Sequence, residues 1–403
     1  MTKSRGLFGG VIALYFVIAL EVLIMISPFA AFFYAAFNPV LLFFARSPAT
    51  SWLAAFFLPH MVLPPGLFLK TVRVAGSVLF VGGAIVFLAC AGQVYFHKFL
   101  RRGPALGGLY RWIRHPQYLA LAATGVGLAI LWPRFLTVVL WVIMVGLYYL
   151  LARDEERRMV SQFGDRYREY MERTGMFLPR RLEGAAGRLP FPKSPALRPL
   201  TGFALLALVA IGGAFTLRAC TVRSLPLWSQ GRITAMTILP ADSMMLEHRM
   251  AEVLELPEVK SRLDESPGPM LVYLVPQQYV MQGMIADTGP QWRLYEHHQT
   301  LAMIADWVFH PFRHLQGGHH MMMRHDMGGT AATSTAPGGI VRRLIFLRLD
   351  APGEEPTRAE VFGITTTRTP VFFADVDIHN LLLLDVQPLG PGTGWGRVPT
   401  PMF

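Results

Sequence analysis

Long apolar segments follow one another through the first half of the chain and predict membrane-spanning helices. A helix that crosses a bilayer needs about 20 mostly apolar residues. Two further apolar segments are interrupted by prolines, which leaves open whether they span, kink or re-enter the membrane. We therefore predict a polytopic α-helical membrane domain with 5–7 transmembrane helices. The clear candidates are 9–27, 72–96, 135–152 and 200–217, and the interrupted segments are 29–45 and 51–69.

A shorter apolar segment, 118–131, lies just before 135–152 and predicts a helical hairpin that turns at Trp132-Pro133-Arg134. A hairpin returns the chain to the membrane face from which it started. His115 and Glu155 flank the two arms, so both side chains are expected at the same face, where they line one pocket.

The second half of the chain has a different pattern, and it predicts a soluble mixed α/β C-terminal domain. A polar, glycine-rich stretch interrupts this domain and predicts a flexible His/Met/Gly-rich loop, 310–339. We place the domain boundary after the last membrane helix, giving domains 1–217 and 218–403. The expected strands are 232–239, 270–275, 342–349, 370–376 and 381–386, with helices near 246–263 and 295–309.

Composition and charge agree with a membrane setting. Of the 403 residues, 53% are hydrophobic and 16% charged, and the mean hydropathy is +0.38. Residues 1–217 carry 22 basic and 8 acidic side chains, whereas residues 218–403 carry 15 and 18. The basic loops indicate a cytoplasmic N-terminus, a multi-pass protein of a bacterial inner membrane, and a periplasmic C-terminal domain. Membrane lipids are the expected partners, and no basic stripe with interleaved aromatics indicates nucleic acid.

The run Arg114-His115-Pro116-Gln117-Tyr118 begins the hairpin and is the first candidate for chemistry. Proline suits the first turn of a helix, whose backbone N–H groups can hold a carboxylate or a phosphate. The alternative is an ordinary helix start with a belt of interfacial tyrosine and arginine.

The run Arg153-Asp154-Glu155-Glu156 follows the hairpin and is the second candidate. Ionisable groups beside apolar helices are costly, which favours a functional role. The alternative is a solvated helix start stabilised by the helix dipole. A charged helix over roughly 154–174 is expected next, packing Phe163, Tyr167 and Tyr170 against the membrane surface.

Taken in order, these elements resemble one family of membrane enzymes. The set comprises Gly108-Leu109-Tyr110, the Arg114–Tyr118 run, Glu155-Glu156, Phe163-Gly164 with Tyr167 and Tyr170, and Leu178-Pro179. It resembles the isoprenylcysteine carboxyl methyltransferases and the integral-membrane phospholipid methyltransferases over residues 72–182. One position departs from the pattern: Ala120 stands where many members carry glycine.

The resemblance implies an S-adenosylmethionine-dependent methyltransferase acting on a lipid, or on a prenyl- or lipid-like carboxylate or amine. Catalytic roles would fall to Arg153, Glu155 and Glu156, and Pro179 would belong to a cap over the cofactor. The implied cofactor-binding residues are Gly108, Tyr110, Arg114, His115, Pro116, Tyr118, Glu156, Tyr167 and Tyr170.

Two other functions stay open. Membrane sterol reductases share a similar pattern and use NADPH, although the doubled Glu155-Glu156 favours methyl transfer. The fused C-terminal domain suggests instead a catalytically silent scaffold, or an accessory subunit of a membrane complex, that docks a periplasmic protein partner.

The glycine-rich loop contains a group of soft ligands that suits copper. The alternative is a mobile loop or a methionine-rich contact surface. The candidate metal ligands are His314, His319, His320, Met321, Met323 and His325.

Overall fold

The computed structural model describes most of the chain in several stretches. These are residues 38–58, 67–100, 104–186, 194, 197–237, 239, 242–277, 340–351, 353 and 355–389. The described residues form two compact units. Those from Lys70 to Leu217 belong to the first unit, and those up to Leu69 and from Arg218 onward belong to the second.

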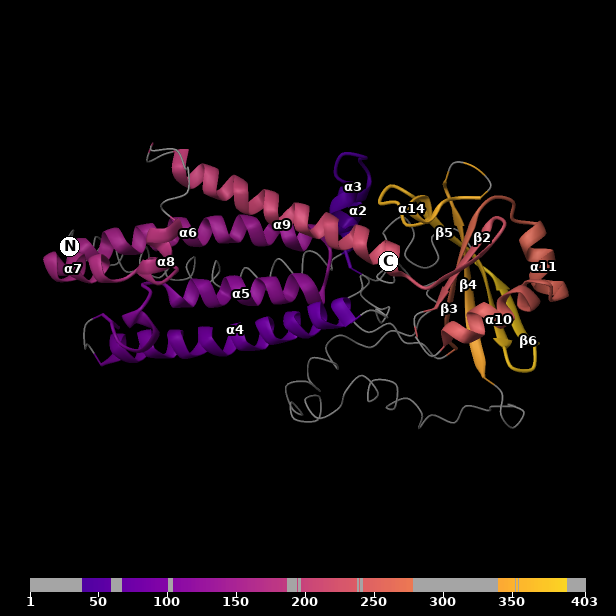
Figure 1. Ribbon diagram of the computed structural model, residues 1–403, viewed down its shortest axis with the longest axis horizontal. Coiled ribbons are helices and arrows are strands. Elements are labelled where there is room, and N and C mark those ends of the chain that lie inside the picture. The colour runs from indigo at the N-terminus through magenta and orange to yellow at the C-terminus, as the bar shows by residue number, and fades with distance from the viewer. Residues whose placement is uncertain are drawn as a thin grey trace, which may run out of the picture. The chain divides into compact units, whose positions relative to one another are not determined.

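The first unit is entirely helical in its described part (Figure 1). The first residues of α4 and the last residues of α9 are assigned to the second unit, so these two helices belong to both units. In chain order the helices are α4 (Leu67–Phe99), η1 (Gly108–Arg111), α5 (Pro116–Leu131), α6 (Phe135–Phe163), α7 (Asp165–Arg173), α8 (Arg180–Ala186) and α9 (Leu197–Ser224).

Three of the described helices, α4, α6 and α9, are long and apolar enough to cross a membrane, and α5 is a shorter apolar helix. The predicted segment 9–27 lies outside the described residues. Before α4, which begins at Leu67, the described parts of the proline-interrupted segments form α2 (Asn38–Ala45) and α3 (Ser51–Ala54), of 8 and 4 residues, which are too short to span. The structure therefore supports a helical membrane part, but its described residues do not supply the predicted 5–7 spans.

Close contacts at glycines bring α4, α5 and α6 side by side (Figure 1). A Cβ on Gly83 of α4 would lie 2.5 Å from the Thr124 hydroxyl of α5, and one on Gly127 of α5 would meet the backbone of Phe80. Between α5 and α6, a Cβ on Gly125 would lie 2.5 Å from the Trp141 ring. Small residues at these crossings allow the close backbone approach that stabilises helix pairs in lipid.

The arms α5 and α6 form the predicted hairpin. The Trp141 indole donates a hydrogen bond of 2.9 Å to the Ala122 carbonyl, and nearer the other end the Tyr118 and Tyr148 rings stack with centroids 5.3 Å apart. The helices are thus antiparallel, and the start of α5 lies beside the second half of α6.

The prediction of a single helix over 154–174 was wrong. Instead, α6 continues without interruption through the charged run to Phe163, and α7 begins at Asp165. Gly164, which separates the two helices, has a φ of 58°, a conformation that side chains with a Cβ rarely adopt. This glycine ends α6 and redirects the chain.

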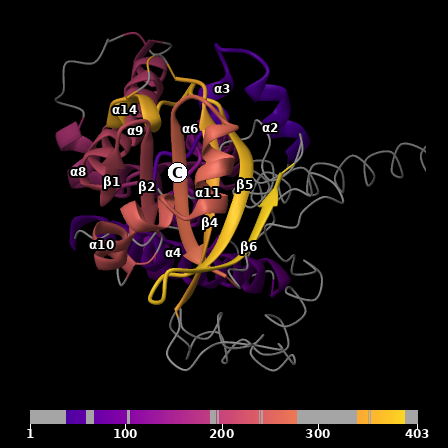
Figure 2. The same cartoon turned by 90° about the vertical axis from the view of Figure 1, so that its right-hand side faces the viewer.

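The second unit contains a six-stranded mixed sheet in the order β1-β2-β3-β4-β5-β6 (Figure 2). Only the β2–β3 pair is parallel; the other neighbours are antiparallel. Five strands match predicted ones, and β1 was not predicted. The strands are β1 (Leu227–Gln230), β2 (Ile233–Thr237), β3 (Met270–Pro276), β4 (Val341–Leu349), β5 (Arg368–Asp377) and β6 (Leu382–Pro388).

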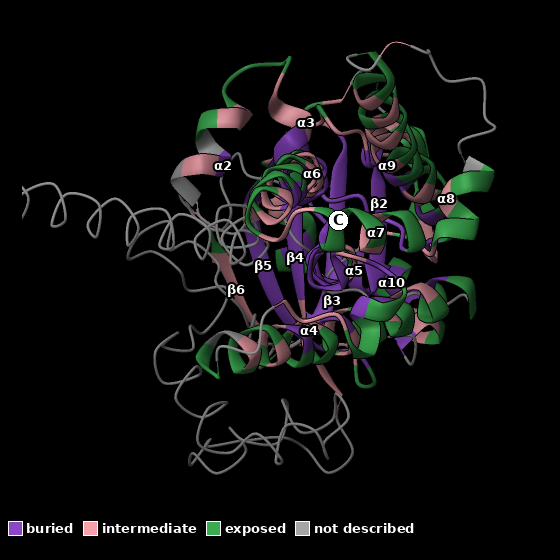
Figure 3. Ribbon diagram, turned by 90° about the vertical axis from the view of Figure 1, so that its left-hand side faces the viewer, coloured by how far each residue is buried: buried purple, intermediate pink, exposed green. Residues whose placement is uncertain are grey.

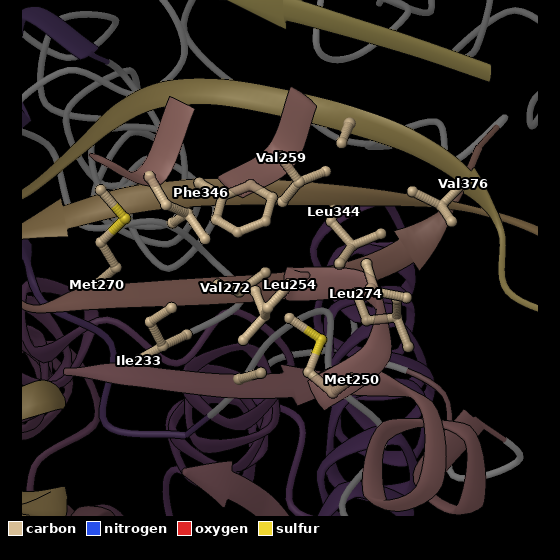
Figure 4. Close-up of a cluster of buried hydrophobic side chains, with 14 of the residues drawn as sticks. Ile233, Met250, Leu254, Val259, Met270, Val272, Leu274, Leu344, Phe346 and Val376 are labelled. Carbon is tan, nitrogen blue, oxygen red and sulfur yellow. The ribbon is translucent and has the colours of Figure 1, made fainter. Parts of the chain in front are cut away.

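Two helices, α10 (Ser243–Leu254) and α11 (Pro257–Asp264), cover one face of this sheet. Met250, Leu254 and Val259 pack onto alternate residues of the central strands (Figure 4). One helix was predicted over 246–263, but Pro257 has no N–H and starts a second helix instead. The predicted helix 295–309 lies outside the described residues. Figure 3 shows the central strands as the most buried part of this unit.

The segment before α4 packs within the second unit. Ala54 and Phe56 are fully buried, and the guanidinium of Arg218 donates hydrogen bonds to the carbonyls of Phe56 and Phe362. Phe362 follows the short helix α14 (Arg358–Val361). Residues of the first and second halves of the sequence therefore share this unit.

Candidate functional site

The two candidate runs meet at one end of the hairpin. His115 caps α5 and is 1% exposed, and its Nε2 lies 3.3 Å from Oε1 of Glu156 on α6. Its Nδ1 lies 3.5 Å from Oε2 of Glu155, which also receives a 3.5 Å hydrogen bond from the Tyr118 hydroxyl. The hairpin thus places an imidazole, a phenol and two carboxylates together.

The two glutamates have different surroundings. Glu156 is bound by Arg114 Nε at 2.5 Å, and both side chains are 9% exposed. With Arg114 and His115 on the same oxygen, the charge of Glu156 is compensated within the protein. The Glu155 side chain is 40% exposed, so it is the carboxylate of this pair that a ligand can reach.

The glutamates also set the charge of His115. Burial lowers the pKa of this imidazole, but its interactions with Glu155 and Glu156 outweigh burial and raise the pKa above its ordinary value. The Nδ1 contact with Glu155 is at ion-pair distance without forming a hydrogen bond, so we regard the Nε2–Glu156 contact as the firmer of the two.

Aromatic side chains form one wall of the cluster. The His115 ring stacks on Tyr118 at a centroid distance of 5.6 Å, and the centroid of the Phe177 ring lies 6.0 Å from that of His115. Phe177 and Met176 pack against a buried cluster that comprises Tyr118, Leu121, Tyr148 and Ala152. Aromatic faces of this kind attract cations, especially where water is excluded.

A chain of hydrogen bonds supports the loop before α5. The Tyr170 hydroxyl donates to the Tyr110 carbonyl at 2.6 Å, and the Tyr110 hydroxyl donates to Gln117 Oε1 at 3.1 Å. Gly108, with a φ of 60°, starts this loop beside Gln93 of α4. Burial raises the pKa of Tyr170 to about 12 and also raises that of Tyr110. Both phenols therefore stay neutral and act as hydrogen-bond donors.

Residues 174–178, here called the strap, run beside the start of α5. Gly175 forms a parallel bridge with Ile113. The backbone N–H of Arg114 donates to the Gly175 carbonyl at 2.9 Å, and that of His115 donates to the Met176 carbonyl at 3.1 Å. The Arg114 guanidinium also donates to the Thr174 carbonyl. Arg114 therefore joins the strap to Glu156.

Not every predicted site residue joins the cluster. Tyr167 is buried on α7 with its ring 5.5 Å from that of Tyr170, and Pro179 follows the strap. Arg153 is exposed, and its guanidinium lies over the Tyr149 ring at 5.9 Å.

The predicted metal ligands from His314 to His325 lie outside the described residues, so copper binding stays a prediction. Within the described part of the chain, no group of three or more His, Cys, Asp or Glu side chains is arranged to hold a metal ion.

The departure at Ala120 is accommodated by the neighbouring helix. Ala120 is 6% exposed, and α4 presents Gly83 beside it, where an added Cβ would lie 2.8 Å from the Ala120 carbonyl. The close approach of the two helices is thus provided by a glycine on α4.

Among the contributors whose side chains were not predicted to act here are Gln93, Gln117, Phe177 and Glu183. Gln117 lies inside the Arg114–Tyr118 run, so its polarity at a buried helix start was a usable signal. Gln93 and Glu183 act through contacts with backbone groups, and Phe177 through a contact with a ring; no pattern of side chains in the sequence indicates these contacts.

The cluster is suited to binding a cationic ligand against one accessible carboxylate and aromatic faces. No curated protein and no solved structure matches the chain. Residues 66–166, from the start of α4 into α7, match the family model of the phospholipid methyltransferases, which confirms the predicted resemblance over about a quarter of the chain.

Proposed function

We propose that this chain is a membrane enzyme that transfers a methyl group from S-adenosylmethionine to a lipid or lipid-like acceptor. The observation that carries the proposal is the meeting of His115, Glu155 and Glu156 inside the segment that matches the phospholipid methyltransferase family. Membrane methyltransferase activity is what this family suggests, and the apolar helices fit an acceptor that resides in the bilayer.

The side chains present suit S-adenosylmethionine. When bound, this donor supplies a methyl carbon on a sulfonium cation. The half-exposed Glu155 carboxylate offers a counter-charge, and the partly exposed ring of Phe177 offers a cation–π contact. The N-terminus of α5 favours the carboxylate of the donor through its helix dipole.

Three of the charged residues have other tasks in this proposal. Arg114 holds the strap and Glu156, so it supports the pocket rather than binding the donor's carboxylate directly. Glu156 keeps Arg114 and His115 in place. Arg153 packs over the Tyr149 ring.

The acceptor is a lipid or lipid-like carboxylate or amine. Methyl transfer is a displacement at carbon, so the residues contribute mainly alignment and exclusion of water. A carboxylate acceptor is already a nucleophile and becomes a neutral ester. An amine must lose a proton, and the accessible Glu155 is the candidate base.

The site faces the cytoplasm of a bacterial inner membrane in this proposal. The proposal counts five crossings: the three long apolar helices α4, α6 and α9, the shorter α5 as partner of α6 in the hairpin, and the span that the sequence predicts over 9–27, outside the described residues; the basic loops then lie inside. The second unit then lies in the periplasm. It includes residues 36–69, which follow the first crossing and precede the second.

Incubation of the purified full chain with methyl-tritiated S-adenosylmethionine and an extract of membrane lipids tests the proposal. We expect label in the lipid fraction, and a loss of most of this label with Glu155→Gln. Binding of the donor without any transfer to lipid would favour the silent-scaffold alternative. Binding of NADPH in place of S-adenosylmethionine would favour the reductase alternative.

A further inference from the structure

Glu183 lies on α8, beyond the segment that matches the family model, and it binds the strap directly. Its Oε1 accepts hydrogen bonds from the backbone N–H groups of Phe177 at 2.9 Å and Leu178 at 3.2 Å. One carboxylate oxygen thus holds two consecutive amides of the same short segment. Bonds from amides to a charged acceptor are stronger than those to a neutral one.

Gly175 allows the strap to turn closely against this carboxylate. A Cβ at Gly175 would collide with the Leu178 carbonyl and would lie 2.8 Å from the Glu183 carboxyl carbon. Any larger residue would therefore displace either the turn or Glu183. The position of the Glu183 carboxylate therefore depends on the absence of a side chain at residue 175.

The opposite side of the strap is bound to the start of α5. The backbone amides of Arg114 and His115 donate to the carbonyls of Gly175 and Met176. Phe177 follows directly, and its ring lies 6.0 Å from the His115 ring. Glu183 thus fixes the backbone of the residue whose side chain forms a wall of the His115 cluster.

We infer that Glu183 is a positioning residue for the methyl donor: it holds Phe177 against the His115 cluster and so shapes the wall of the donor pocket. The inference rests on the proposed function. Glu183 touches neither of the reacting groups and acts through the backbone of Phe177. Its loss therefore weakens binding of the donor more than it slows transfer once the donor is bound.

The experiment compares three variants of the full chain with the wild type, measuring the Kd and KM for S-adenosylmethionine and kcat. Glu183→Ala should raise Kd and KM roughly tenfold, because the two backbone bonds that hold Phe177 in place are lost, and should change kcat little. Glu183→Gln should weaken donor binding clearly less than Glu183→Ala, because its amide oxygen can accept the same two bonds but carries no charge. Glu169→Ala, which removes an exposed ion pair with Arg173, is the matched control and should change nothing.

Phe177→Leu keeps both backbone bonds to Glu183 and removes only the ring. It therefore tests whether the Phe177 ring forms part of the donor pocket even if Glu183→Ala fails to fold. We expect its Kd to rise as well. Unchanged affinity in Phe177→Leu or in a folded Glu183→Ala, or equal weakening in Glu183→Gln and Glu183→Ala, overturns the inference alone. A wild type that binds no S-adenosylmethionine overturns the proposed function and the donor role of Glu183 with it.

Discussion

His115 and Glu156 are 41 positions apart in the chain, and their side chains meet at 3.3 Å between Nε2 and Oε1. This contact connects the start of α5 to the second half of α6. Because Arg114 binds the same glutamate and also the strap, one carboxylate organises both helices and the segment that follows α7. The two adjacent glutamates are therefore expected to behave differently when they are changed.

Glu156→Ala should destabilise the protein far more than Glu155→Gln. Removing one partner of a buried ion pair leaves the other uncompensated, at a cost of about 3–5 kcal/mol. Glu156 and Arg114 are each 9% exposed, whereas the Glu155 side chain is 40% exposed. Thermal unfolding in detergent measures the difference. Equal melting temperatures for the two variants would contradict the assignment of Glu156 to structural support.

The contribution of His115 to stability should fall as the pH rises. Its pKa is raised in the folded protein, because Glu155 and Glu156 outweigh the effect of burial. The folded state therefore binds the proton more tightly than the unfolded state does. The stabilisation is fully present below the unfolded pKa of about 6.5 and is lost as the pH rises through the raised value.

Melting temperatures of the wild type and His115→Gln, measured from pH 6 to pH 9, check this sign. The gap between the two proteins should narrow with increasing pH. A gap that is constant, or that widens toward alkaline pH, would show that the imidazole is not held in its charged form.

Gly175→Ala should displace the strap. The new Cβ would collide with the Leu178 carbonyl and press on Glu183. Overpacking of this kind typically costs about 1–3 kcal/mol. Gly184→Ala on α8 is the matched control, since a Cβ there meets nothing within 4 Å. We expect a lower melting temperature only for Gly175→Ala, and equal behaviour of the two variants would count against the strap geometry.

Adjacent glycines on α4 offer a test of the helix packing beneath the site. Gly83→Ala should destabilise the protein, because its Cβ would lie 2.5 Å from the Thr124 hydroxyl and 2.8 Å from the Ala120 carbonyl. Gly82→Ala faces open space and should be tolerated. Unfolding by denaturing detergent measures both variants. If Gly82→Ala lowered the stability more than Gly83→Ala, the face of α4 that carries Gly83 would not be the one that packs against α5.

The sequence was sufficient to bring His115 and Glu155 together, because a hairpin of two apolar segments returns the chain to one membrane face. It also indicated most strands of the C-terminal sheet, where apolar runs are bounded by turns. The separation of α6 and α7 at Gly164 was missed because the charged residues continue the helical pattern on both sides.

The roles within the cluster could not be predicted from the sequence. Glu155 and Glu156 are equivalent by residue type, and they differ because Glu156 is buried against Arg114 whereas the Glu155 side chain is 40% exposed. The strap depends on backbone carbonyls that accept from Arg114 and His115, and every residue has such a carbonyl. Its attachment to Glu183 is likewise a backbone contact, so no pattern of side chains indicates it.

Calorimetric binding of S-adenosylmethionine to the purified full chain tests the central claim most directly, with NADPH titrated in parallel. The wild type should bind S-adenosylmethionine and not NADPH. Glu155→Gln should bind the donor roughly tenfold or more weakly, because it removes the accessible carboxylate but keeps the fold. A wild type that binds only NADPH, or a Glu155→Gln variant with unchanged affinity for S-adenosylmethionine, would contradict the account.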